Sequence, residues 1–295
     1  AARGHDVTIL TFDPPGGQPF YTLDPRVNRV DLGIGDSSLP AGFIETLVRI
    51  LALRRVMKAE LPDVAVGFMH SMFVPLAFAL VGSGVPVLGS EHIVPEHYRT
   101  RRLQYLLFFL AIPFLSKLTV LSKAIRSTYP IVVRQRMVEM PNPVEATANC
   151  ANVGGEDKRF IILSVGRLEA QKDHATLIRA FGQITHKFPQ WRLKIVGEGA
   201  LRSDLANLTE VLDLQAKVTM PGVTSAIVDE YMAAEIFVIP SRYEAFGLVT
   251  AEAMSHGLPV VGFADCPGTN ELIDADKTGL LVVTGRDRVG ALASA

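Results

Sequence analysis

The sequence contains very little cysteine. Its 295 residues include two, Cys150 and Cys266, which lie far apart and outside any CxxC or Cys/His spacing typical of zinc sites. A disulfide framework and a cysteine-based zinc site are therefore excluded. The scarcity also favours a reducing compartment, in which both thiols serve packing.

An excess of charge of either sign is also missing. The 29 Lys and Arg residues are balanced by 30 Asp and Glu residues, for a net charge of −1, and 48% of the residues are hydrophobic. This composition excludes an intrinsically disordered chain and a nucleic-acid surface held by bulk positive charge. We therefore expect a globular protein without a nucleic-acid partner.

No hydrophobic run is long enough to cross a membrane. The longest, "LQYLLFFLAIPFL" from Leu103 to Leu115, is shorter than the roughly 20 residues of a spanning helix, and Pro113 interrupts it. Because the basic stretch "YRTRR" precedes it, two alternatives remain open. The run is either a buried core helix or a helix that lies on an anionic membrane surface.

A signal peptide is not visible, and the sequence opens without methionine. The opening "AARG" looks like the last turn of a helix that ends at Gly4, and the closing "RVGALASA" looks like the first turns of another. We therefore expect an internal fragment of a longer chain, located in the cytoplasm or peripherally on the inner face of the membrane.

The sequence does contain a regular alternation of strand-like and helix-like segments. In the first half the strand-like runs are "DVTILTF", "DVAVGF", "VPVLGS" and "KLTVLS", with the amphipathic segment "FIETLVRILALRRVMKAEL" among them. In the second half they are "FIILSVG", "RLKIVG", "KVTMPG", "IFVIPS", "LPVVGF" and "GLLVVT". This alternation predicts α/β domains with parallel strands and crossover helices.

The alternation breaks once, at "EMPNPVEATANCANVGGEDKR", which is rich in Pro, Asn, Ala and Gly and has no periodicity. The length also fits two domains of about 100 to 200 residues. We predict an N-terminal Rossmann-like domain over 1–145, a linker over 146–158 and a C-terminal Rossmann-like domain over 159–295. Ligands of such doubly wound sheets bind at the carboxyl ends of the strands.

Two cations follow the first strand of the second domain. In "SVGRLEAQKDH" these are Arg167 and Lys172, and the next strand ends at "VGEGA" with Gly197 and Gly199. The cations suit an anionic ligand, although Arg and Lys at such places are often simply solvated. The glycines permit close backbone approach, but an incomplete GxGxxG is weak evidence by itself.

Two glutamates flank the start of a helix in "RYEAFGLVTAEAMSHGLPV". The helix is predicted to begin near Phe246 or Gly247, so Glu244 precedes it and Glu252 lies inside it. Capping and a solvated helix face explain either glutamate alone. Together with the unpaired N–H groups of a helix start, however, two carboxylates suit a polyol, and the two cations suit a diphosphate. The ligand to test is a sugar nucleotide.

These segments resemble the retaining glycosyltransferases of family 4, whose GT-B fold consists of two facing Rossmann-like domains. The resemblance is carried by "GRLEAQKDHATLIRAF", "VGEGALRSDL", "SRYEAFGLVTAEAMSHGLPVV" and "GTNELI", in the family's order and spacing over the second domain, with a looser match in the first. Within it, Glu244 and Glu252 form the E-x7-E motif.

The resemblance implies roles for residues that would contact the nucleotide. Arg167 and Lys172 would bind and neutralise the diphosphate of the sugar donor, close to Gly197. Glu252 would bind the ribose. The base would lie near "MPGVTS", around Val223.

It also implies the residues around the transferred sugar. Glu244, together with the backbone of Phe246, Gly247 and Leu248, would hold the sugar. From the first domain, His92 in "VLGSEHIVPEH" would approach it at the corresponding place.

Metal-binding alternatives are disfavoured. His92, Glu96 and His97 lack HExxH or HxxEH spacing, and Pro95 disfavours a regular ligand-bearing helix. The "DAD" at Asp274–Asp276 sits in a polar turn, where turn chemistry explains its carboxylates. The resemblance likewise implies binding of the sugar nucleotide without a metal or other cofactor.

The resulting expectation is a retaining glycosyltransferase in cell-surface polysaccharide synthesis. It would move a hexose-type sugar from a nucleotide diphosphate sugar, expected to be a UDP-sugar, to a glycan or lipid-linked glycan. Its implied route is a front-face displacement in which the leaving phosphate assists the acceptor, with Glu244 as nucleophile the less favoured alternative. A non-catalytic nucleotide-sugar binder, or an inactive fragment of such an enzyme, remains open. A nicotinamide-dependent oxidoreductase is disfavoured because no strand leads into a complete GxGxxG.

Overall fold

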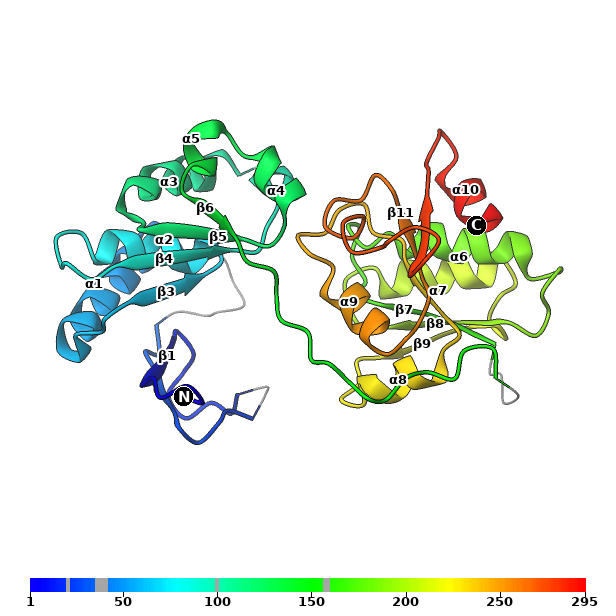
Figure 1. Cartoon of the computed structure of the whole chain (residues 1–295), viewed down its shortest axis with the longest axis horizontal. Helices are drawn as coiled ribbons and strands as arrows, with labels where there is room; N and C mark the ends of the chain where they lie inside the picture. The colour runs from blue at the N-terminus through cyan, green and yellow to red at the C-terminus, as the bar shows by residue number, and fades with distance from the viewer. Residues whose placement is uncertain (20–21, 35–41, 99–100, 156–159) are drawn as a thin grey trace. The chain divides into compact units, whose positions relative to one another are not determined.

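The computed structural model describes residues 1–19, 22–34, 42–98, 101–155 and 160–295, except for the side chains of Phe43, Glu96 and His97. The metal alternative at Glu96 and His97 therefore concerns side chains outside the described ones. The chain divides into two compact units, one of Ala1–Glu91 with Arg101–Thr119 and one of His92–Thr100 with Val120–Ala295 (Figure 1). The linker at 146–158 and the two domain boundaries stay a prediction.

The described residues before residue 140 form two sheets. Strands β1 and β2 form a parallel pair, and β3, β4, β5 and β6 form a second sheet in that order. The strands are β1 (Val7–Thr11), β2 (Val27–Asp31), β3 (Ala65–Phe68), β4 (Val87–Glu91), β5 (Lys117–Val120) and β6 (Met137–Glu139). The helices are α1 (Phe43–Glu60), α2 (His70–Ala79), α3 (Arg102–Ala111), α4 (Lys123–Thr128) and α5 (Ile131–Arg134), with 3-10 turns η1 (Pro95–Tyr98) and η2 (Ile112–Phe114).

The part after residue 160 contains a six-stranded parallel sheet in the order β12-β11-β10-β7-β8-β9. Its strands are β7 (Ile161–Val165), β8 (Arg192–Val196), β9 (Val218–Gly222), β10 (Ile236–Ile239), β11 (Val260–Phe263) and β12 (Gly279–Val282). The chain runs outward from β7 to β9, then returns to place β10 on the other side of β7. Such a reversal opens a crevice at the carboxyl ends of the two central strands.

Helices cover both faces of this sheet. They are α6 (His174–Ile184), α7 (Arg202–Val211), α8 (Ile227–Ala233), α9 (Leu248–Ser255) and α10 (Arg288–Ser294). One core packs α6, α7 and α10 against one face through side chains such as Phe181, Leu205 and Leu292. The other core packs α8 and α9 against the opposite face through Tyr231 and Ala253 (Figure 1). The predicted doubly wound α/β arrangement is thus confirmed for this sheet.

The sequence predicted most of these elements. All ten strand-like runs form strands, the amphipathic segment forms α1, and the closing residues form α10. Strands β2 and β6 were missed because "VNRVD" and "MVE" are short and half polar. The helix expected to end at Gly4 is a turn, closed by a hydrogen bond from the Gly4 N–H to the Ala1 carbonyl at 3.0 Å.

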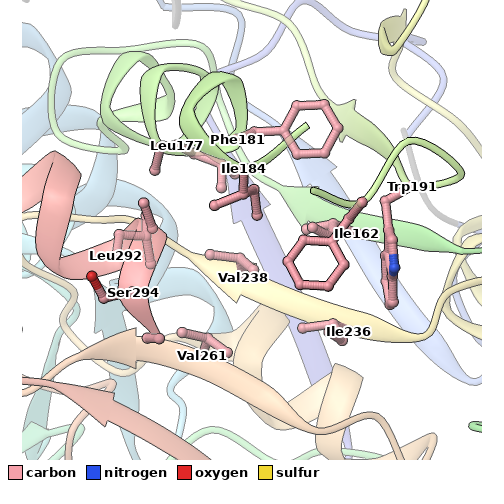
Figure 2. Close-up of a pocket in the computed structure, with 14 residues that line it drawn as sticks. Ile162, Leu177, Phe181, Ile184, Trp191, Ile236, Val238, Val261, Leu292 and Ser294 are labelled. Atoms are coloured by element: carbon pink, nitrogen blue, oxygen red, sulfur yellow. The ribbon is translucent and has the colours of Figure 1, made fainter. Parts of the chain in front are cut away.

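An apolar cavity of about 310 Å³ lies at the amino edge of the six-stranded sheet, between α6 and the end of α10. Ile162 and Ile236, at or near the starts of β7 and β10, line it together with Trp191 and Leu292 (Figure 2). The strand-end crevice is at the opposite edge. This cavity is therefore separate from the candidate site.

Candidate active site

The reversal of strand order brings two loops together at the carboxyl ends of β7 and β10. The Arg242 N–H donates to the Gln171 carbonyl at 2.9 Å, and the Gln171 side-chain amide donates back to the Tyr243 carbonyl at 2.8 Å. These two hydrogen bonds hold the loop after β7 against the loop after β10. Lys172 and Glu244, the next residue in each loop, are thereby placed face to face.

Lys172, Glu244 and Ser241 form a compact buried cluster. The Lys172 ammonium and the Ser241 hydroxyl each donate to the same oxygen of Glu244, Oε1, and both distances are 2.6 Å. The side chains of Lys172 and Glu244 are only 13% and 9% exposed. Among the described residues no group donates to the second oxygen, Oε2, so this atom remains to accept a hydrogen bond from a ligand.

Helix α9 begins directly after this cluster. Its N-cap, Gly247, has φ +83°, and a Cβ there would lie 3.0 Å from the Thr269 hydroxyl. Within the described part of the chain, no protein group accepts from the N–H groups of Phe246, Gly247, Leu248 or Val249. These N–H groups are therefore free to bind a hydroxyl or an anion at the positive end of the helix. The predicted helix start is confirmed.

Glu252 lies one turn into α9 and is half buried. The Tyr231 hydroxyl of α8 donates to Glu252 Oε2 at 2.9 Å, and the Tyr231 ring stacks on His256 at 5.0 Å. Burial first, and then the charge of Glu252, raise the pKa of Tyr231, so that its hydroxyl stays a proton donor. Tyr231 thus fixes one carboxylate oxygen of Glu252.

Arg167 is not part of the Lys172 cluster. Its guanidinium pairs with Glu169 at 2.9 Å, and its side chain is 67% exposed. The backbone places it directly after β7, as predicted, but the side chain contacts neither Lys172 nor Glu244. The structure therefore brings one of the two predicted cations to the glutamate and leaves the other in solvent.

The packing of the protein's own backbone requires a glycine at position 197. It has φ +145°, and a Cβ there would overlap the carbonyl oxygen of Gly166. Gly199 is similarly close to the backbone of Leu168. The loop after β8 therefore packs against the loop after β7 through glycines, and contact of Gly197 with a ligand stays a prediction.

The remaining predicted site residues are exposed or half buried. Val223 follows β9 and is 73% exposed, while Leu248 is 38% exposed and Phe246 is half buried. His92 follows β4 and is half buried, which lowers its pKa below the usual value. The imidazole is therefore neutral near pH 7.

Three polar residues around the site were missed from the sequence. Ser241 and Tyr231 orient the two glutamates, and His174 is buried at the start of α6 beside Ser164, 3.5 Å away. Burial first, and then the charge of Lys172, lower the pKa of His174 to about 4. A lone Ser, Tyr or His carries no pattern, so only the position of Ser241 at the end of β10 offered a signal.

The metal alternatives gain no support from the geometry. Among the described residues, no three His, Cys, Asp or Glu side chains lie together so that they could hold an ion. In the "DAD" segment Asp274 pairs with Lys277 at 2.8 Å, and its backbone N–H bonds to Thr278 within the same turn. Independence from a metal stays a prediction.

Two family models match the chain, one after the other. Residues 1–147 match the model described as Glycosyltransferase Family 4, and residues 148–294 match the model described as Glycosyl transferases group 1. A relative from Haemophilus influenzae, named an uncharacterized glycosyltransferase, is 28% identical over 95% of this chain and 78% of its own. A Campylobacter jejuni relative, named as an undecaprenol-linked α-1,4-N-acetyl-D-galactosaminyltransferase, is 24% identical over 95% of this chain and 77% of its own.

Solved structures share the fold. Sucrose-phosphate synthase from Thermosynechococcus elongatus matches with a TM-score of 0.79 and 21% identity, over 100% of this chain and 79% of that one. The Anabaena protein HepE, solved in complex with UDP and glucose, matches with a TM-score of 0.72 and 22% identity, over 91% and 74%. With the parallel sheets described above, these matches show the GT-B fold. The chain belongs to the glycosyltransferases of family 4 and is a transferase that moves glycosyl groups.

Proposed function

We propose that this glycosyltransferase moves a hexose-type sugar from a UDP-sugar to a glycan or lipid-linked glycan, with retention of anomeric configuration, in the synthesis of a cell-surface polysaccharide. The observation that carries the proposal is the cluster at the strand reversal. There the Lys172 ammonium is held on Glu244 Oε1, while Glu244 Oε2 and the first N–H groups of α9 remain free. A cation, an acceptor oxygen and a row of N–H donors are what a sugar diphosphate requires.

The charge that develops during the reaction explains why the site would need cations. Breaking the bond between the sugar and the phosphate builds negative charge on the diphosphate and positive charge on the sugar ring. Lys172, the start of α9 and Arg167 would stabilise the diphosphate more strongly in the transition state than in the ground state. A single preorganised donor of this kind is typically worth about 2.7 to 4 kcal/mol in other enzymes.

The retaining route assigned to the chain is a front-face displacement. The anomeric C–O bond to the phosphate breaks with its electron pair going to the phosphate oxygen, and the acceptor oxygen bonds to the same face of the anomeric carbon. The acceptor's proton goes to the leaving phosphate. Two hydrogen bonds already occupy Glu244 Oε1, which lowers the nucleophilicity of the carboxylate and supports this route over a covalent Glu244 intermediate. His92 is assigned to the sugar from the N-terminal side.

Support for UDP and for the acceptor comes from the relatives. HepE was solved with UDP and glucose, and the Campylobacter relative is named for an undecaprenol-linked substrate. For this chain we accordingly propose UDP as the carrier, no metal requirement, and a lipid-linked acceptor met at the cytoplasmic face of a membrane. None of the described helices is long and apolar enough to cross a bilayer.

The test is a screen of hydrolysis and transfer with UDP- and GDP-sugars, combined with calorimetric titration of UDP, GDP and NAD. We expect UDP to bind and one UDP-sugar to be hydrolysed slowly, with no change in EDTA. Proton NMR of the fresh product should show the anomer of the sugar donor. Binding of NAD but of neither nucleotide diphosphate, or an inverted product, would overturn the respective part of the proposal.

A further inference from the structure

Helix α3 and the turn η2 are apolar on two opposite sides. On the buried side Phe108 and Ala111 are fully covered, and the Phe108 ring meets Phe73 of α2 edge-on at 5.9 Å. The other side is in solvent. Its four large side chains are Leu103, Leu106, Leu110 and Phe114, which are 68%, 54%, 51% and 45% exposed.

These four residues, called here the α3 stripe, form a continuous row. Their spacings of three, four and four residues place them on one side of a helix. Single exposed apolar residues are common on protein surfaces, but a contiguous apolar row marks an interaction surface. A helix of this kind, apolar on the side away from the core, has a second apolar environment to meet.

The charge around the α3 stripe indicates which environment that is. Residues 101–119, which carry the α3 stripe, contain three Arg and Lys residues and no Asp or Glu, although the whole chain has a net charge of −1. Arg102 begins α3 and Lys117 follows η2, and both are exposed. Among the described residues neither has an ion-pair partner. A basic border, with no acid in the same segment, complements the phosphates of anionic lipids.

We propose that the α3 stripe docks on the surface of an anionic phospholipid bilayer. The helix lies along the surface, with the leucines and Phe114 entering the boundary between headgroups and acyl chains and with Arg102 and Lys117 on lipid phosphates. The proposal rests on the proposed function in one respect, since a lipid-linked acceptor would be presented at this surface. Both alternatives for Leu103–Leu115 are then combined in one helix, with one side in the core and one on the membrane.

The experiment is co-sedimentation of the protein with vesicles of phosphatidylglycerol and phosphatidylethanolamine, compared with vesicles of phosphatidylcholine. We expect binding to the anionic vesicles alone, and weaker binding at higher salt because exposed charges are screened. The paired substitutions Leu106→Ser with Leu110→Ser, and Arg102→Glu with Lys117→Glu, should each weaken binding by about tenfold or more.

Two matched variants control for general effects on the surface. Val211→Ser alters an 83% exposed side chain on α7, and Lys187→Glu reverses an exposed charge after α6. Both should bind vesicles like the unaltered protein. All four variants change exposed side chains, so their thermal melting and UDP binding should be unchanged. If UDP fails to bind any form while vesicle binding follows the expected pattern, the proposed function is overturned and the docking surface stands.

Three results would overturn the docking surface itself. One is equal binding to neutral and anionic vesicles, and another is full vesicle binding by both α3 variants. The third is a dimer in analytical ultracentrifugation that Leu106→Ser with Leu110→Ser converts to a monomer. That last result would assign the α3 stripe to a second copy of the chain.

Discussion

At the scale of single residues, the site depends on which oxygen of which glutamate is already occupied. Glu244 has Oε1 held by Lys172 and Ser241, and Glu252 has Oε2 held by Tyr231. Each carboxylate is therefore oriented before a ligand arrives, with one oxygen left to accept from it. Preorganisation of this kind reduces the reorganisation that binding requires.

The first prediction concerns the cations. Lys172→Ala and Arg167→Ala should each lower turnover of the sugar donor by about a hundredfold or more, because each removes a charge proposed to stabilise the leaving diphosphate. Initial rates with saturating acceptor measure this, and Lys187→Ala provides the matched lysine control. Near-normal rates for both variants would refute the assignment. The exposed pair of Arg167 with Glu169 contributes little to stability, so loss of folding is not expected for Arg167→Ala.

The second prediction separates the two glutamates. Glu252→Ala should weaken binding of both UDP and the UDP-sugar, because the ribose is present in each, whereas Glu244→Ala should leave UDP binding largely intact. Tyr231→Phe should share the defect of Glu252→Ala in milder form, about threefold to tenfold, since one hydrogen bond is typically worth about 1 kcal/mol. Calorimetry with both ligands measures the effects. Equal losses for Glu244→Ala and Glu252→Ala would refute the division of roles.

The third prediction concerns pH and His174. Its pKa is about 4 in the folded protein, below the usual 6.5, so the unfolded chain binds more protons between these values. The free energy of unfolding should therefore fall by up to about 3 kcal/mol on acidification from pH 7 to 4. Urea titrations of the protein and of His174→Gln measure the difference. A His174→Gln variant with the same pH dependence above pH 4.5 would show that another group dominates.

At the scale of elements, glycines allow close packing in the loops after β7, β8 and β10 and at the start of α9. Gly247 is left-handed and adjoins Thr269, while Gly197 fits against Gly166. In the sequence, Gly197 indicates space for a ligand. A glycine in a loop indicates that space is needed, but it does not indicate which atoms fill that space. The contact with Gly166 joins loops that lie about thirty residues apart, and local patterns carry no information on it.

The fourth prediction tests the start of α9. Gly247→Ala should lower the free energy of unfolding by about 1 to 2 kcal/mol, because alanine is disfavoured at φ +83° and its methyl group would press on Thr269. Gly84→Ala is the matched control, since its φ is +79° and its Cβ would meet nothing. Chemical denaturation should show the larger loss for Gly247→Ala. A UDP affinity unaffected by this substitution would indicate that the helix start does not contact the nucleotide.

At the scale of the whole molecule, both cores around the six-stranded sheet are built from residues 151–293. The cluster around Glu244 and the contact of Tyr231 with Glu252 also lie within this stretch. The residues proposed to bind the nucleotide, apart from His92, therefore belong to a single sheet with its helices.

The fifth prediction follows from this arrangement. A fragment of residues 146–295 should fold and bind UDP within about threefold of the whole chain, but should transfer no sugar, because the acceptor side and His92 are absent. Circular dichroism, thermal melting and calorimetry measure this. An unfolded fragment would contradict the predicted linker at 146–158 and would leave the nucleotide site unchallenged in the whole chain.

The sequence by itself determined the alternation of strands and helices, the positions of Lys172 and Glu244 at strand ends, and the family, since these depend on local periodicity and short motifs. Tertiary structure alone decided that β10 returns beside β7, so that two residues 72 positions apart share one hydrogen bond. It also decided the roles of Ser241 and Tyr231 and the exposed side of α3. The physical reason is that strand order and the burial of a given side chain depend on packing between distant segments, which no local pattern encodes.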